Sequence, residues 1–219
     1  MTSPLVLLDL DGTLTDSAPG IMGSVVCAFT DLGLPLPDAT GLRSFVGPPL
    51  PDSMLAHGVP PERVDEAIAA YRRRFEAGGM WENEVYAGIP EQLRLLREAG
   101  FTLAVATSKP EVYARPICDR YGLSALVDGV FGAPLDHIPS SKASVIAHAL
   151  KDLGPDRVPA TDRVVMVGDR HHDVAGAAEH GFACLGVAWG YAEPGELADA
   201  VAIIDEVSQL AARVSAQLA

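Results

Sequence analysis

The chain has 219 residues, 48% of them hydrophobic, which suits one large domain or one domain with a modest insertion. Its formal net charge of −13 argues against nucleic acid and anionic membranes as partners. No apolar run approaches the roughly 18 residues of a membrane span, and the N-terminus lacks the basic flank of a secretory signal. The three cysteines are odd in number and scattered among apolar residues, which predicts reduced thiols and a cytoplasmic protein. A monomer or a homodimer is expected.

The first predicted element is a buried strand at Leu5–Leu8 that runs into two acids, Asp9 and Asp11, and a turn at Gly12. Strand side chains alternate between faces, so both carboxylates can point the same way from the strand end. Such a pair suits Mg²⁺, and an Asp carboxylate can also attack phosphorus. Acids that merely face water are the alternative at this point.

Residues 16–84 contain no clear strand, only helical patterns broken by Gly and Pro. We expect them to form a helical cap domain, inserted into a core made of residues 1–15 and 85–219. One predicted helix carries an apolar stripe at helical spacing, Val64, Ile68, Tyr71 and Phe75. The basic run 72–74 on the same helix is interpreted as a solvated face.

From residue 101 onward, aliphatic runs alternate with amphipathic segments, which predicts an α/β fold with a Rossmann-like, doubly wound parallel sheet. The predicted strands are Phe101–Thr107, Leu126–Phe131, Val164–Gly168, Cys184–Trp189 and a weaker Val201–Ile204. The predicted helices start near Pro90, Pro110, Ser141, His171 and Asp205. Such sheets bind ligands at the carboxyl ends of their strands.

Polar residues follow several of these strands. Thr107 and Ser108 end one strand just before a helix, where a hydroxyl and backbone N–H groups can hold a phosphate or simply cap the helix. Lys142 lies at a helix start, the unfavourable end of the helix dipole for a cation, which hints at a functional constraint on what is otherwise a surface lysine.

A further strand runs straight into Asp169, and Asp173 follows on the first turn of the next helix. Acids that stabilise a helix N-terminus explain Asp173 but not a strand ending in Gly-Asp. Together the strand-end residues supply the groups that hydrolysis of a phosphate ester requires: a nucleophile, a proton donor, cations and ligands for a metal.

These motifs resemble the haloacid dehalogenase superfamily, in its phosphatase branch with a helical cap after the first motif. The four matching motifs are Asp9-Leu-Asp11-Gly-Thr-Leu, Thr107-Ser108, Lys142, and Gly168-Asp169 with Asp173. The match covers essentially the full length.

The resemblance implies that Asp9 is the nucleophile and Asp11 the general acid/base. It implies phosphate binding by Thr107, Ser108 and Lys142, and Mg²⁺ binding by Asp9, the Asp11 carbonyl, Asp169 and Asp173. Family dehalogenases lack the second acid of the first motif, so Asp11 favours phosphate esters, whose leaving alkoxide needs a proton.

Within the family, several segments resemble the group of phosphoglycolate phosphatases and 5′-nucleotidase-like enzymes, with those around Trp81-Glu82-Asn83 and Val85–Gly88 favouring the nucleotidase side. Ala192 stands where the family often has a second glycine after Trp-Gly-Tyr. The expected substrate is a small phosphorylated metabolite. A sugar-phosphate mutase is the enzymatic alternative, and a non-catalytic phospho-signalling or binding module is a less favoured one.

Five other side chains are assigned expected places. Arg43 in the cap and Lys109 in the core are candidate substrate contacts, because the substrate is anionic. His171 and His172 are expected to be exposed on a first helical turn, since Mg²⁺ prefers oxygen ligands. Tyr191 is expected to pack at a strand end.

Overall fold

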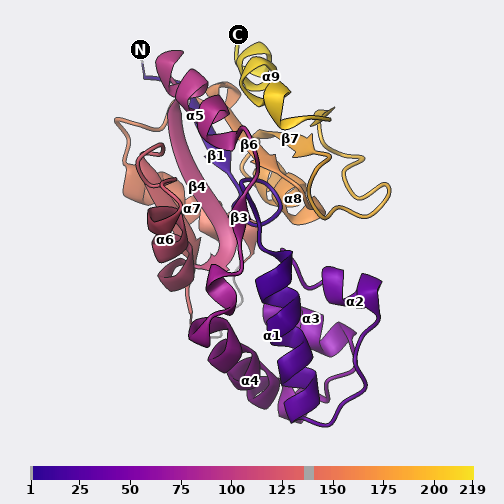
Figure 1. The fold of residues 1–219 in the computed structure, drawn as a ribbon. Coiled ribbons are helices and arrows are strands. Elements are labelled where there is room, and N and C mark those ends of the chain that lie inside the picture. Colours follow the sequence, from indigo (N-terminus) through magenta and orange to yellow (C-terminus); the bar gives the residue numbers. More distant parts are fainter. Residues whose placement is uncertain (1, 136–140) are drawn as a thin grey trace.

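The computed structural model describes residues 2–135 and 141–219 (Figure 1). Its centre is a sheet of parallel strands in the order β5-β4-β1-β6-β7-β8. The strands are β1 (Leu5–Leu8), β4 (Thr102–Pro110), β5 (Gly129–Ala133), β6 (Val164–Gly168), β7 (Ala183–Val187) and β8 (Ala202–Ile204). Leu8 of β1 is in register with Val105 and with Val167, so β1 and β6 end side by side, whereas β4 between β1 and β5 runs on to Pro110.

Helices cover both faces of the sheet. Alternate residues of β1 divide between two cores: Val6 and Leu8 face one, Leu5 and Leu7 the other. The first core is closed by α5 (Ile89–Glu98), α6 (Glu111–Arg120) and α9 (Leu210–Gln217), and the second by α7 (Lys142–Leu153) and α8 (His171–Glu179). This arrangement confirms the predicted doubly wound α/β fold.

The remaining helices gather beyond the carboxyl ends of the strands (Figure 1). They are α1 (Ala18–Asp31), α2 (Ala39–Arg43), α3 (Leu50–Ala56) and α4 (Val64–Ala77). The chain enters this layer through β2 (Thr15–Asp16) and leaves it through β3 (Glu84–Val85), and these two short strands pair antiparallel. The predicted stripe of α4 is buried along its whole length.

Several predicted boundaries were wrong. β4 runs on to Pro110, through a register shift against β5 that follows Thr107, and β5 starts later than expected. The last helix begins at Leu210 rather than near Asp205, because a 3₁₀ turn at Val207–Gln209 precedes it. β2 and β3 were missed, since two-residue strands carry no periodic signal.

The structure also bears on the state of the cysteines and on membrane-spanning segments. Cys27, Cys118 and Cys184 are all free thiols. Among the described residues, no helix combines the length and the apolarity that a membrane crossing requires.

Candidate active site

The end of β1 positions the two acids of the first motif differently. The N–H of Asp9 still donates to the carbonyl of Val167 at 2.9 Å, which continues the sheet ladder by one residue. Beyond it the chain turns, with Gly12 in the left-handed region at φ 80°. Strand alternation therefore does not govern Asp11, and the two carboxylates have different partners.

Lys142 is the cation paired with Asp9. Its Nζ lies 2.9 Å from Asp9 Oδ1 and 2.6 Å from Asp173 Oδ1, and it donates to the carbonyl of Ala106 at 3.1 Å. The side chain is buried, which by itself lowers the pKa of Lys142, but Asp173 and Asp9 outweigh burial and raise it. The unfavourable charge at the start of α7 is thus explained by two buried carboxylates.

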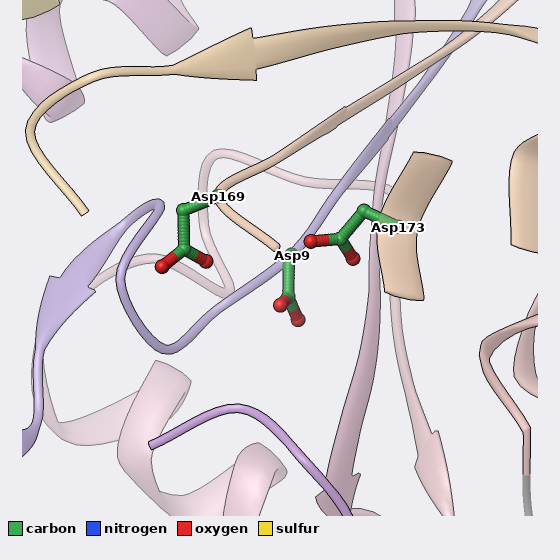
Figure 2. Close-up of side chains that lie close together, drawn as sticks. All are labelled: Asp9, Asp169 and Asp173. Carbon is green, nitrogen blue, oxygen red and sulfur yellow. The ribbon is translucent and has the colours of Figure 1, made fainter. Parts of the chain in front are cut away.

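Three acids meet beside this lysine. The carboxylates of Asp9, Asp169 and Asp173 have oxygen atoms within 4.8 Å of one another, and all three side chains are buried. In the view of Figure 2, Asp9 lies between the other two. They come from the ends of β1 and β6 and from the first turn of α8.

The cluster holds more negative than positive charge. Burial, followed by the charges of Asp173 and Asp9, raises the pKa of Asp169 well above its ordinary value. Burial also raises the pKa of Asp173 in spite of Lys142. Three carboxylates against one ammonium, with oxygen as the donor atom, fit a hard divalent cation such as Mg²⁺.

Glycines let the neighbouring loops approach Asp169. The N–H of Tyr191 donates to Asp169 Oδ2 at 2.8 Å. A Cβ at Gly190 would lie 2.3 Å from the Cβ of Asp169, and one at Gly12 would lie 2.1 Å from Asp169 Oδ2. No larger residue fits at either position without displacing this carboxylate.

Asp11 faces another way. Its Oδ2 lies 2.9 Å from Lys109 Nζ, and both side chains are almost completely buried. Its Oδ1 is buried with no hydrogen-bond partner among the described residues. Lys109 Nζ in turn lies 4.9 Å from the ring centroid of Phe75, on α4.

A cavity of about 510 Å³ opens beside Asp11, between the sheet end and the helical layer. Its walls are mainly apolar and aromatic, with Phe45, Tyr71 and Phe75 from the helical layer. Ser108 and Lys109 line the core side. The cavity thus joins a polar wall, with Asp11 and Lys109, to an aromatic wall from the helical layer.

Comparison with known proteins identifies the family of the chain. The family model described as haloacid dehalogenase-like hydrolase matches residues 6–187. The chain belongs to this family.

Its relatives carry more than one activity in their names. A 5′-nucleotidase of Pseudomonas aeruginosa is 42% identical over 89% of this chain and 86% of its own length. The tyrosine-protein kinase PtkA of Mycobacterium tuberculosis is 46% identical over 85% of this chain and 62% of its own. The crystal structure of a predicted phosphatase from Clostridium acetobutylicum is 38% identical and superposes with a TM-score of 0.90, covering 99% of this chain and 100% of that one. This haloacid dehalogenase-like hydrolase is of the phosphatase type.

The other sequence-predicted site residues of this hydrolase lie as follows. Thr107 is buried in β4, just before the register shift against β5, and its Oγ1 accepts the N–H of Lys109 at 3.2 Å. The Asp11 side chain, paired with Lys109, is not one of the three clustered acids among the described residues. Arg43 donates to the carbonyl of Gly190 at 3.1 Å and lies over the Tyr191 ring, and it is not among the described residues that line the cavity.

Two residues that were interpreted as exposed or solvated line the cavity, and for His172 the expected exposure was wrong. His172 is half-buried and lines the cavity; burial, followed by the neighbouring charges of His171 and Arg170, lowers its pKa to about 4. Arg72 also lines the cavity and donates to the carbonyl of Leu135 at 2.8 Å. Both were missed because their neighbours come from distant parts of the chain.

Tyr191 is buried as expected, but sequence reasoning missed that it and Arg170 join the layers of the hydrolase. Tyr191 accepts hydrogen bonds from the N–H groups of Ser17 and Ala18 and donates to Asp16, at the base of the helical layer. Arg170 donates to the carbonyl of Val46 in that layer. The Trp189-Gly190-Tyr191 run was the available signal for the first; Arg170 had none beyond its place beside Asp169.

Arg170 is itself held by Glu196, whose Oε1 lies 2.7 Å from Arg170 Nε. Burial alone would raise the pKa of Glu196. Hydrogen bonds from Arg170, Glu193 and His171 outweigh it and hold that pKa at about 2. The Glu196 carboxylate, which holds Arg170 between the two layers, is therefore charged at every physiological pH.

Proposed function

We propose that the protein is a Mg²⁺-dependent phosphomonoesterase that hydrolyses a small phosphorylated metabolite through an aspartyl-phosphate intermediate. One observation carries the proposal: two neighbouring aspartates have separate surroundings. Asp9 lies in the acid cluster beside Lys142, whereas Asp11 faces the cavity with one buried oxygen free. Such a division suits a nucleophile and an acid/base.

In the first half-reaction a carboxylate oxygen of Asp9 bonds to phosphorus while the bond to the leaving oxygen breaks. Asp11 gives its proton to that oxygen. In the second, Asp11 takes a proton from water as the water oxygen attacks phosphorus, which releases inorganic phosphate and regenerates Asp9. Lys142, already placed beside Asp9, stabilises charge on the phosphoryl oxygens together with Thr107 and Ser108.

The acid cluster would hold the metal ion through Asp9 and Asp169, supported by Asp173 and by the Asp11 carbonyl. Mg²⁺ would supply positive charge against the phosphoryl oxygens. Chelation by EDTA should abolish phosphate release, and added Mg²⁺ should restore it. Full activity after complete metal removal, checked by elemental analysis, would contradict this assignment.

Residues 16–84 are proposed to act as a cap domain on a core formed by residues 1–15 and 85–219. The two-stranded β2–β3 ribbon supports this division, because it is the point at which the chain crosses twice. The cap supplies most of the cavity wall. Its movement would admit substrate and then exclude water.

The nucleoside 5′-monophosphate type of substrate is favoured over the phosphoglycolate type. The cavity of about 510 Å³ is far larger than a two-carbon acid requires, and its aromatic walls suit a flat base. The 5′-nucleotidase relative supports the same choice. Free thiols and a net charge of −13 support an enzyme of the cytoplasm, a monomer or a homodimer, that acts on free metabolites rather than on nucleic acid or membranes.

The decisive experiment measures phosphate release with Mg²⁺ from nucleoside monophosphates, phosphoglycolate, sugar phosphates and phosphotyrosine. Asp9→Asn is the control, expected to fold normally and to lose at least about 10³-fold in kcat, since it removes the nucleophile. Substantial residual activity in the variant would overturn the mechanism. Isomerised sugar phosphate without phosphate release would favour the mutase, and phosphotyrosine formed from ATP would favour the activity named for the mycobacterial relative.

A further inference from the structure

Lys109 was expected to bind substrate, but its ammonium group lies against a catalytic carboxylate. The distance from Lys109 Nζ to Asp11 Oδ2 is 2.9 Å, with side-chain exposures of 5% and 7%. Removal of either side chain from such a buried pair leaves the polar group of its partner without compensation. The contact is therefore a fixed part of the site.

The pairing leaves Asp11 with a defined orientation. One oxygen, Oδ2, is held by Lys109, and the other, Oδ1, is buried and has no partner among the described residues. A carboxylate held on one oxygen presents the other in a fixed direction. Asp11 lines the cavity, so this direction decides where its proton can be delivered.

Lys109 is itself held from two directions. Its backbone N–H donates to Thr107 Oγ1 at 3.2 Å, and its Nζ lies 4.9 Å from the Phe75 ring centroid. That ring is fixed in turn, because it stacks with Tyr71 and meets Tyr113 edge-on. Phe75 belongs to α4, so the cap completes the surroundings of the lysine.

We infer that Lys109 is a positioning residue that aims Asp11 at the leaving oxygen, and that Phe75 of the cap holds Lys109 in place for this role. The inference rests on the proposed phosphomonoesterase function. It differs from direct substrate binding in one measurable respect. A positioning residue for the acid matters most when the leaving oxygen needs a proton, whereas a substrate-binding cation matters equally for all esters.

The test compares two substrates of nearly the same shape, phenyl phosphate and 4-nitrophenyl phosphate. The nitrophenolate leaves without a proton, whereas the more basic phenolate needs one. In Lys109→Met, kcat/KM for phenyl phosphate should fall about tenfold further than for 4-nitrophenyl phosphate, since general acid catalysis contributes about 10²–10⁴-fold. An equal loss on both esters, or a rise in KM alone, would overturn the inference.

Arg72→Met is the matched control, because Arg72 is a second cation of the same cavity and is bonded to Leu135 instead. Its loss should lower kcat/KM for both esters by the same factor. A preference for the nitrophenyl ester as large as that of Lys109→Met would show that any lost cavity charge has this effect, and would refute the special role of Lys109.

Phe75→Leu tests the contribution of the cap without removing a charge. It should shift the ratio between the two esters in the same direction as Lys109→Met, and should shift it no further when Lys109 is already Met. If the effects of Phe75→Leu and Lys109→Met on the ester ratio add fully in the double variant, Phe75 does not act through Lys109.

Wild-type protein and Asp9→Asn separate this inference from the function on which it rests. If the wild type releases phosphate from both esters and Asp9→Asn does not, the proposed function holds. An unchanged ester ratio in Lys109→Met then refutes only the positioning role. No phosphate release by the wild type would refute the function itself.

Discussion

Asp169 has the least favourable surroundings of any single acid in the site. It is fully buried beside two further carboxylates, and burial and these charges raise its pKa well above the ordinary 3.8. A buried Asp with a raised pKa destabilises the folded state wherever it is ionised. In the metal-free protein, function and stability therefore conflict at this residue.

Asp169→Asn should accordingly stabilise the metal-free protein while abolishing phosphatase activity. We expect a gain of about 1–2 kcal/mol, or a melting temperature higher by roughly 3–6 °C for a chain of this size. Mg²⁺ should raise the melting temperature of the wild type but have little effect on the variant. A variant that melts below the metal-free wild type would contradict this account.

The difference in stability between Asp169→Asn and the metal-free wild type should depend on pH with a definite sign. The destabilisation is fully present above the raised folded-state pKa and disappears below the ordinary value of 3.8, because Asp169 is then protonated in both states. The stability advantage of Asp169→Asn should thus shrink as the pH falls from neutrality. Chemical denaturation of both metal-free proteins at several pH values measures it, and an advantage that grows on acidification would exclude Asp169 as its source.

Gly190 matters because of what lies beside it. A methyl group there would be 2.3 Å from the Cβ of Asp169, so Gly190→Ala must displace the carboxylate or the loop. We expect at least a tenfold loss of kcat, because even a small misplacement of a catalytic group slows the reaction by about this much or more. Gly23→Ala in α1 is the control: its nearest neighbour would be 3.8 Å away, and it should gain about 0.5–1 kcal/mol of stability. Normal activity of Gly190→Ala would show that the loop adapts.

The β2–α1 junction depends on one phenol group. Tyr191 Oη accepts the N–H groups of Ser17 and Ala18 at 3.0 and 3.2 Å and donates to Asp16 Oδ1 at 2.6 Å. The backbone N–H of Tyr191 donates to Asp169 Oδ2, so this one residue joins the acid cluster to the start of the helical layer. The ends of a helix need such partners for their free N–H groups.

Tyr191→Phe should therefore destabilise the protein by about 1–3 kcal/mol, because the buried N–H of Ser17 loses its acceptor, whereas that of Ala18 keeps Asp16 Oδ1 at 3.2 Å. The amides of Ser17 and Ala18 should also exchange hydrogen faster. Tyr121→Phe is the matched control, since its hydroxyl makes one bond, to the carbonyl of Trp81 at 2.9 Å, and a smaller loss is expected. Equal losses in the two variants would argue against a special role for the junction.

The whole molecule carries a net charge of −13, and its expected substrate is an anion as well. Repulsion at long range should slow the encounter, and salt screens it over a Debye length of about 8 Å at physiological ionic strength. We expect kcat/KM to rise with added NaCl at a fixed Mg²⁺ concentration. A fall would show that the local field of Lys109, Lys142 and Arg72 dominates the approach.

The sheet was predictable and the cap–core contacts were not. Strands such as Val164–Gly168 are continuous aliphatic runs, and their signal is local. The roles of His172 and Arg72 depend on neighbours contributed by other segments, so their own sequence context suggested only a solvated surface. The start of α9 was misplaced for a different reason, because a 3₁₀ turn and a helix share the same local pattern.

The chemical groups of the site were predictable without the structure: Asp9 and Asp11 follow β1, Asp169 follows β6, Thr107 lies in the last part of β4, and Lys142 begins α7. Because parallel strands of one sheet end along the same edge, such residues must come together. Which lysine pairs with which aspartate could be seen only in the folded chain, because the pairing depends on side chains that approach one another from β1, β4 and α7. The cavity likewise arises only where residues of the helical layer meet residues at the sheet end, because its lining residues are far apart in the sequence.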